Sequence, residues 1–318
     1  MNDKRCGMPI GRRAWLAGLA GTSLLPLSTA HAQLVDALAS NALIGAGSTF
    51  AHPLMRAWAD EYRVFRKGGV ALDYEAVGSQ AGIARVRARA VDFAVSEMPL
   101  TKADLERDAL LQLPLVTGAV AVAAHLGGPR GQALRLSAPL LADIFLGRVK
   151  NWSDPAIAQQ NPGLNLPNAP IAVLHRADGS GTTFVFTQFL SQTSADWKSQ
   201  VGSDLLVNWP VGEGHKGNAG VARALARTPG AMAYLNQAEV SADMTTASVQ
   251  NPSGRFVVPT RASVQAAAAV GPWDAAAGFN TLLVNMRGED SYPIVAAVFG
   301  LLNERSAGFR SLARTFFE

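Results

Sequence analysis

Residues 170–194 read PIAVLHRADGSGTTFVFTQFLSQTS and carry three structural signals in a row. The opening PIAVLH alternates in the way that a short strand does. The closing TTFVFTQFLSQTS is typical of a helix, with Ser180 or Thr182 as its N-cap. RADGSG lies between them and is a glycine-rich turn. Strands that lead into helices through such turns are typical of α/β folds.

The same turn also has the features of an anion site. Backbone N–H groups at the start of a helix point away from the helix, and the helix dipole favours negative charge there. Arg176 adds a planar fork of donors that matches an oxyanion. Taken alone, the turn leaves two interpretations open, an anion site or an ordinary turn with a surface arginine.

The order of strand, glycine turn and helix recurs along the chain. GAGSTF (45–50) and GSQAG (78–82) each follow a short strand pattern and each place Ser or Thr at the entrance of a helix. Three helix N-termini of this kind could converge on one small anion. Nucleotide binding is disfavoured, because Phe50 stands where a dinucleotide fingerprint needs its third glycine and no Walker lysine follows any turn. The alternation predicts an α/β fold.

An export signal is predicted at the N-terminus. RRAWLAGLAGTSLLPLSTAHAQ (12–33) has paired arginines, an apolar stretch and a small-residue site that predicts cleavage after Ala32. The arginine pair favours the twin-arginine route over the general one. Cys6, the only cysteine, would leave with residues 1–32, and the formal net charge would fall from +4 to about +1. That charge gives no support for nucleic acid or membrane partners, and no later apolar stretch is long enough to span a membrane.

Seven stretches, taken together and in order, resemble the periplasmic phosphate-binding proteins of bacterial phosphate ABC transporters. They run from about Leu43 to Phe317: GAGSTF, VGSQAGI, VDFAVSEMPL, LADIFLGRVKNWSDPAIAQQNPGLNLP, RADGSGTTFVFTQFL, WPVGEGHKGNAGVA and PGAMAYL. The resemblance implies a two-lobed periplasmic-binding-protein fold of type II with the ligand in the cleft between the lobes. Lobe I would comprise residues 33–118 plus 293–318, and lobe II residues 119–292.

The resemblance also implies a dehydrated phosphate held by all three turns. The implied contacts are Ser48, Thr49, Phe50, Ser79, Glu97, Arg176, Ser180, Gly181 and Thr182. Asp178 would hold the Arg176 guanidinium in place. Physical chemistry supports such a cage, since a buried multiply charged anion must replace its lost hydration with many fixed donors. One arginine does not neutralise a dianion, so helix N-termini and hydroxyls must supply the remainder.

Two features depart from the family pattern. Glu97 stands where the family normally has an aspartate that accepts a hydrogen bond from the proton that phosphate carries. The glutamate keeps the acceptor but is longer by one methylene, so the cleft must shift or the fit must loosen. The sequence stops at ARTFFE, where family members usually continue through a further helix. That difference is expected to shorten lobe I without touching the phosphate contacts.

The implied function is capture of inorganic phosphate by a periplasmic monomer and its delivery to the permease and ATPase subunits of an ABC transporter. The alternative is a phosphatase-like or phosphate-scavenging secreted protein of the same fold. No enzyme activity, cofactor or metal is expected, because Ser180 lacks an adjacent base and the scattered histidines have no metal spacing. Without the resemblance, the predicted Ser and Thr contacts could be N-caps only. HKGNAG (215–220) is interpreted as a structural turn.

Overall fold

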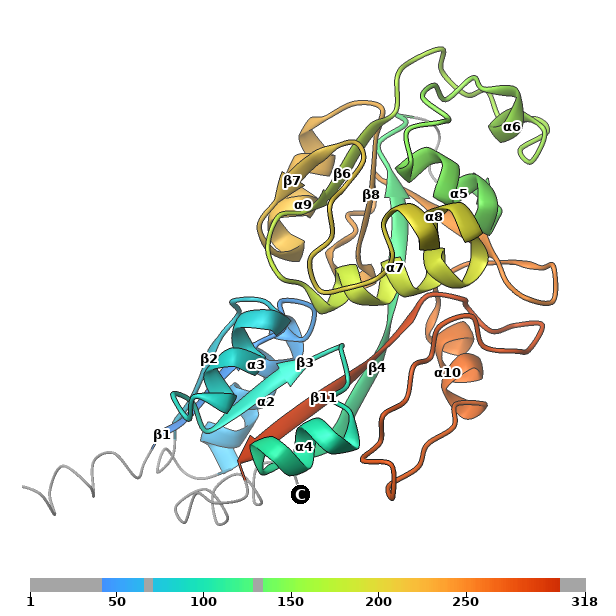
Figure 1. Cartoon of the computed structure of the whole chain (residues 1–318). Coiled ribbons are helices and arrows are strands. Elements are labelled where there is room, and N and C mark those ends of the chain that lie inside the picture. The colour runs from blue at the N-terminus through green and yellow to red at the C-terminus, as the bar shows by residue number, and fades with distance from the viewer. Residues whose placement is uncertain (1–41, 66–70, 128–133, 304–318) are drawn as a thin grey trace, which may run out of the picture. The chain divides into compact units, whose positions relative to one another are not determined.

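The computed structural model describes residues 42–65, 71–127 and 134–303, which belong to one compact unit (Figure 1). The predicted signal peptide, Cys6 and the C-terminal ARTFFE lie outside these residues. The first elements are β1 (Ala42–Gly47), α2 (His52–Phe65), β2 (Ala71–Glu75), α3 (Ser79–Arg87), β3 (Phe93–Ser96), α4 (Lys102–Asp108), β4 (Leu110–Ala124), β5 (Leu134–Leu136) and α5 (Ala138–Phe145). They are followed by α6 (Pro155–Ala158), β6 (Ala172–Arg176), α7 (Gly181–Thr193), α8 (Ala195–Gln200), β7 (Glu213–His215), α9 (Gly217–Arg227), β8 (Ala231–Asn236), the 3₁₀ helix Gln237–Glu239, β9 (Thr245–Gln250), β10 (Phe256–Val257), α10 (Arg261–Ala269) and β11 (Val295–Asn303).

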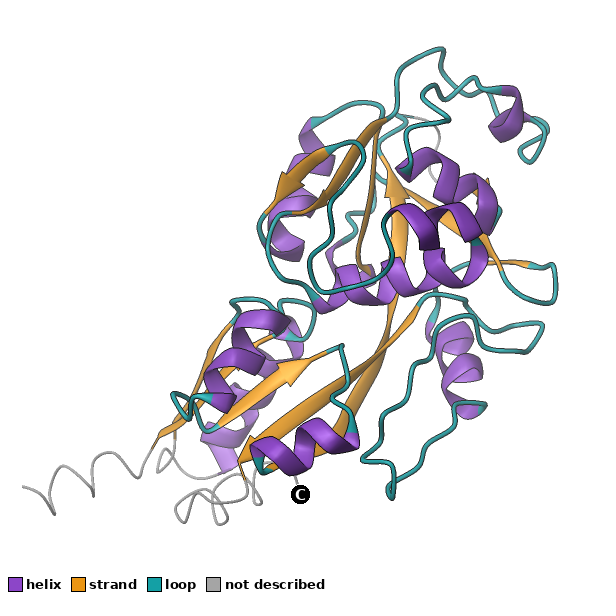
Figure 2. Ribbon diagram, in the orientation of Figure 1, coloured by secondary structure: helices purple, strands orange, loops and turns teal. Residues whose placement is uncertain are grey.

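The strands follow the path β2-β1-β3-β11-β4-β8-β6-β7, and β9 pairs with β4, β5 and β10. Parallel pairs join β1 to β2 and to β3, and join β6 to β7 and to β8. β11, the last strand, is antiparallel to both of its neighbours and lies between β3 and β4. The mixture of parallel pairs and helices confirms the predicted α/β class (Figure 2).

One long strand, β4, lies in the middle of this path and joins its two halves. It pairs with β11 along residues 110–119 and with β8 along residues 120–124. A register shift lets Pro114 face Phe299 within this long strand, and such a shift suits a residue that has no N–H to donate. The change of partner falls next to the predicted boundary between the lobes, although the lobe boundaries themselves stay a prediction.

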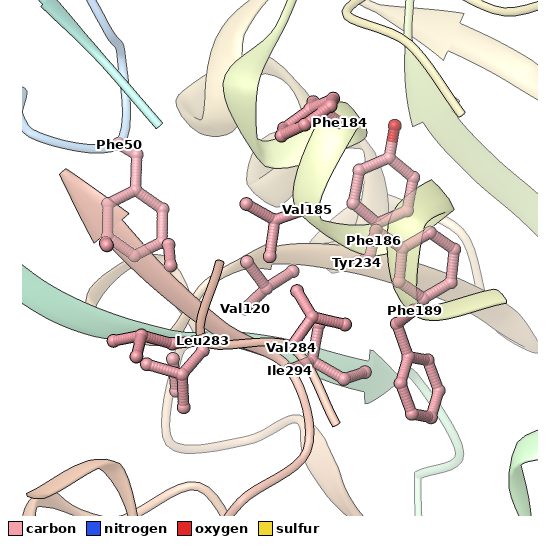
Figure 3. Close-up of a cluster of buried hydrophobic side chains, with 14 of the residues drawn as sticks. Phe50, Val120, Phe184, Val185, Phe186, Phe189, Tyr234, Leu283, Val284 and Ile294 are labelled. Carbon is pink, nitrogen blue, oxygen red and sulfur yellow. The ribbon is translucent and has the colours of Figure 1, made fainter. Parts of the chain in front are cut away.

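Helix α7 lies on the strands and fills much of the core (Figure 3). Residues 181–187, 189 and 190 of this helix are buried, as expected for a helix that other elements enclose. Phe186 stacks on Tyr234 of β8 with ring centroids 4.4 Å apart. Val120 of β4 and Ile294, just before β11, are also fully buried. The start of α7 is therefore held firmly against the sheet.

Close backbone packing fixes the first turn against helix α3. A Cβ added at Gly82 in α3 would lie 2.5 Å from Gly47 Cα, so a larger residue would push the helix off β1. Gly47 itself has φ +138°, a conformation that favours glycine. The two glycines bring the end of β1 and the start of α3 together. No helix among residues 42–65, 71–127 and 134–303 is long and apolar enough to cross a membrane.

Candidate anion-binding site

Backbone hydrogen bonds join the three glycine turns that the sequence singled out. Gly78 N donates to Gly47 O at 2.8 Å, which links the second turn to the first. Gln80 N donates to Gly179 O at 3.2 Å, which links the second turn to the third. Gly78 has φ +95°, and a Cβ there would lie 2.7 Å from Gly179 O. The starts of α2, α3 and α7 thus belong to one neighbourhood.

Arg176 is the last residue of β6, and its side chain is 1% exposed. Its Nε donates to Asp178 Oδ1 at 2.7 Å, and its Nη2 donates to Asp178 Oδ2 at 2.5 Å. Burial raises the pKa of Asp178, but hydrogen bonds from Arg176 and Gly217 N and the charge of Arg176 outweigh it, so that pKa lies below its usual range. The ionised carboxylate fixes the orientation of the guanidinium, and the pair does not involve Nη1.

Glu97 follows β3 and is 2% exposed. Ser48 Oγ donates to its Oε1, and Ser79 Oγ donates to its Oε2 at 2.8 Å. Burial raises the pKa of Glu97 above its ordinary value, while these two hydrogen bonds and the charge of Arg176 act in the opposite direction. The carboxyl group therefore lies among hydroxyl donors, and the positive charge of Arg176 is close enough to lower its pKa.

The third turn ends in the N-terminus of α7. Ser180 is the N-cap, and its Oγ accepts a hydrogen bond from Thr183 N at 3.2 Å. The hydroxyl keeps its own proton for a further acceptor. Gly181 and Thr182 are buried at the first two helical positions, where backbone N–H groups have no carbonyl partner within the helix. These features combine the helix dipole with hydroxyl donors at one point.

Asn218 is a buried residue of the site that sequence reasoning missed. Its Nδ2 lies 3.0 Å from Thr49 Oγ1 and 3.2 Å from Thr182 Oγ1, so it joins the first turn to the third. Its Oδ1 accepts from Asn236 N at 3.1 Å, and Asn236 Nδ2 donates to Phe50 O at 2.7 Å. The available signal was HKGNAG, a fourth glycine turn that leads into a helix, α9.

The structure brings the predicted site residues into three connected groups. Ser48, Ser79 and Glu97 form one, Thr49 and Thr182 meet through Asn218, and Arg176, Asp178, Ser180 and Gly181 lie along the third turn. The side chain of Phe50 packs in the core at 6% exposure, so only its backbone remains for a ligand. Contact of these residues with phosphate stays a prediction. Among the described residues, no three His, Cys, Asp or Glu side chains gather where they could hold a metal ion.

Comparison with known proteins agrees with this fold. The profile of the PBP superfamily domain matches residues 30–318. The phosphate-binding protein PstS of Pasteurella multocida is 40% identical over 265 residues, which cover 83% of this chain and 76% of that protein. The PstS of Haemophilus influenzae is 41% identical over 268 residues, with coverages of 84% and 80%.

Solved structures share the fold at lower identity. A putative phosphate ABC transporter substrate-binding protein from Clostridium perfringens, with bound phosphate, has a TM-score of 0.63 at 18% identity and covers 87% of this chain and 91% of that one. The high affinity periplasmic phosphate-binding protein PfluDING, bound with phosphate, has a TM-score of 0.65 at 22% identity, with coverages of 86% and 84%. The superfamily match and the identities with the two PstS proteins show that the chain belongs to the PstS family of phosphate-binding proteins.

Proposed function

We propose that this protein binds inorganic phosphate in the periplasm and delivers it to the permease and ATPase subunits of a phosphate ABC transporter. The observation that carries the proposal is Arg176, a 1% exposed guanidinium held by Asp178 beside the N-terminus of α7. A buried cation with a fixed orientation, set among buried hydroxyls, matches a small oxyanion. Membership of the PstS family supports phosphate as that anion.

A substrate-binding role is favoured over catalysis. The hydroxyls of Ser48 and Ser79 both donate to Glu97, and Ser180 Oγ accepts the N-cap hydrogen bond of α7. Hydroxyls from separate turns that are directed at one buried acceptor suit the binding of an anion by several donors at once. The PstS family is a family of substrate-binding transport proteins, which supports the same choice.

Phosphate is expected to stabilise the protein against heat. We propose that residues 33–118 with 293–318 and residues 119–292 form the two lobes and close on the anion, which binds only the folded state. Phosphate at 100 times its Kd would then raise the free energy of unfolding by about 2.7 kcal/mol. Thermal melts with phosphate, with chloride as control, would measure the shift, and small-angle scattering would follow closure. Unchanged melting at millimolar phosphate would contradict the proposal.

The exported protein is expected to begin at Gln33 and to lack Cys6. Intact-mass analysis of periplasmic material would establish both points. Changing Arg12 and Arg13 together to Lys should abolish export if the twin-arginine route operates, because that route reads the arginine pair itself. A protein that retains Cys6 with a lipid adduct would contradict the expected cleavage, and normal export of the double-lysine variant would exclude the twin-arginine route.

A further inference from the structure

The carboxylate of Glu97 takes hydrogen bonds from the hydroxyls that the proposed phosphate site needs. Ser48 Oγ donates to Oε1, and Ser79 Oγ donates to Oε2 at 2.8 Å. The two hydroxyls come from different turns, one at the end of β1 and one at the start of α3. Each serine has a single proton to donate, so neither can give it to Glu97 and to a bound anion at once.

Glu97 also lies over the start of α7. A Cβ added at Gly181, the first residue of that helix, would lie 1.7 Å from Glu97 Oε2 and 2.7 Å from Ser79 Oγ. The carboxylate therefore fills the space directly against the helix N-terminus, where the dipole favours negative charge. The charge of Arg176 acts on it from the third turn. Two hydroxyls, a helix start and an arginine together make the surroundings of a bound oxyanion.

We propose that the Glu97 carboxylate is an internal anion that competes with phosphate for Ser48, Ser79 and the start of α7, and so sets the affinity of the site. The inference rests on the proposed function, because it concerns the same site. Phosphate binds only when it displaces the carboxylate from these donors, and the cost of that displacement lowers the measured affinity. The side chain then remains beside the anion as an acceptor.

Side-chain length is what allows Glu97 to compete. The glutamate side chain accepts hydrogen bonds from donors in two separate turns. The Cβ of Glu97 also lies close to Gly181, since a Cβ added at Gly181 would be 2.8 Å from it. Glu97→Asp withdraws the carboxylate by one C–C bond and separates it from at least one hydroxyl. The released hydroxyl is then free for phosphate, while the negative charge and the acceptor are retained.

The test is a double-mutant cycle between Glu97→Asp and Ser79→Ala, read by calorimetric titration with inorganic phosphate. Glu97→Asp should bind phosphate about tenfold more tightly, as expected for release of a charged hydrogen-bond competitor. Ser79→Ala alone should change affinity less than about threefold, because the phosphate and its competitor lose the same donor. In the double variant, Ser79→Ala should lower the affinity for phosphate about tenfold relative to Glu97→Asp alone. Glu106→Asp, on the exposed side of α4, is the matched control and should leave binding unchanged.

The outcomes separate the inference from the proposed function. The competition would be overturned if the wild type binds phosphate and Glu97→Asp binds it equally well or more weakly. It would also be overturned if the effects of Glu97→Asp and Ser79→Ala on affinity simply add. Phosphate binding itself would stand in both cases. Absence of phosphate binding in every variant, with circular dichroism showing folded protein, would overturn both. If Glu97→Asp does not fold, Glu97→Gln replaces it, since a neutral amide cannot act as a competing anion; it too should bind phosphate more tightly, and weaker binding would overturn the inference.

Discussion

Replacing Arg176 with alanine is expected to weaken phosphate binding by about 2–5 kcal/mol, the cost of removing one partner from a buried, hydrogen-bonded charge pair. The loss corresponds to about 30-fold to several-thousand-fold in Kd. Two effects add in the same direction. The anion loses its cation, and the Asp178 carboxylate, which Arg176 now holds through two hydrogen bonds, becomes an unpaired charge beside the site.

Calorimetric titration with phosphate would measure this loss. Arg176→Lys should recover only part of the affinity, because an ammonium group cannot bond to Asp178 and to an oxyanion with the planar fork of a guanidinium. Arg148→Ala is the matched control, since it also breaks an Arg–Asp pair but at the surface, where Arg148 is 44% exposed. Wild-type affinity in Arg176→Ala would remove Arg176 from the site.

Discrimination against sulfate is the second large effect, and it depends on the charge of Glu97. Phosphate and arsenate carry a proton near neutral pH that a carboxylate can accept, whereas sulfate carries none. Sulfate would place two acceptors against each other at a position that is 2% exposed, which disfavours it by about 1–3 kcal/mol or more. The wild type should therefore bind phosphate and arsenate much more tightly than sulfate.

Competition titrations with the three anions would measure that selectivity. Glu97→Gln should reduce it, because the amide offers a donor in place of one acceptor oxygen, and sulfate should gain the most. Glu97→Asp should keep it, because the acceptor and its charge are retained. Equal affinity for sulfate and phosphate in the wild type, or unchanged selectivity in Glu97→Gln, would reassign the site as a general pocket for tetrahedral oxyanions.

The local parts of the fold could be predicted from the sequence because glycine turns report on neighbouring residues. β1, α3, β6 and α7 begin or end next to the predicted turns, and the N-cap of α7 is Ser180, one of the two predicted candidates. The apolar pattern of residues 137–152 extends beyond α5, which ends at Phe145, just before Gly147 with φ +72°. An apolar pattern continues through such a glycine, whereas the backbone conformation stops the helix.

The long-range parts of the site could not be predicted in the same way. Nothing within HKGNAG indicates that Asn218 lies between Thr49 and Thr182, because those partners are distant in sequence. The environment of Glu97 depends on the packing of α7 against the end of β3 and the start of α3, which sequence periodicity does not encode. The glycine turns thus predicted that three helix starts could converge, and the family resemblance implied which side chains lie there. The hydrogen bonds between those side chains depend on long-range packing.

The position of β11 affects how the sheet forms while the chain is being synthesised. This strand comes last among the described residues, yet it lies between β3 and β4 and supplies hydrogen bonds to both. When residues 1–294 have been synthesised, β3 and β4 therefore each have one edge that still lacks its partner strand. Until β11 emerges, those edges are exposed to pairing with other chains. Completion of this part of the sheet thus waits for the synthesis of β11, and a chain truncated before Val295 is expected to aggregate.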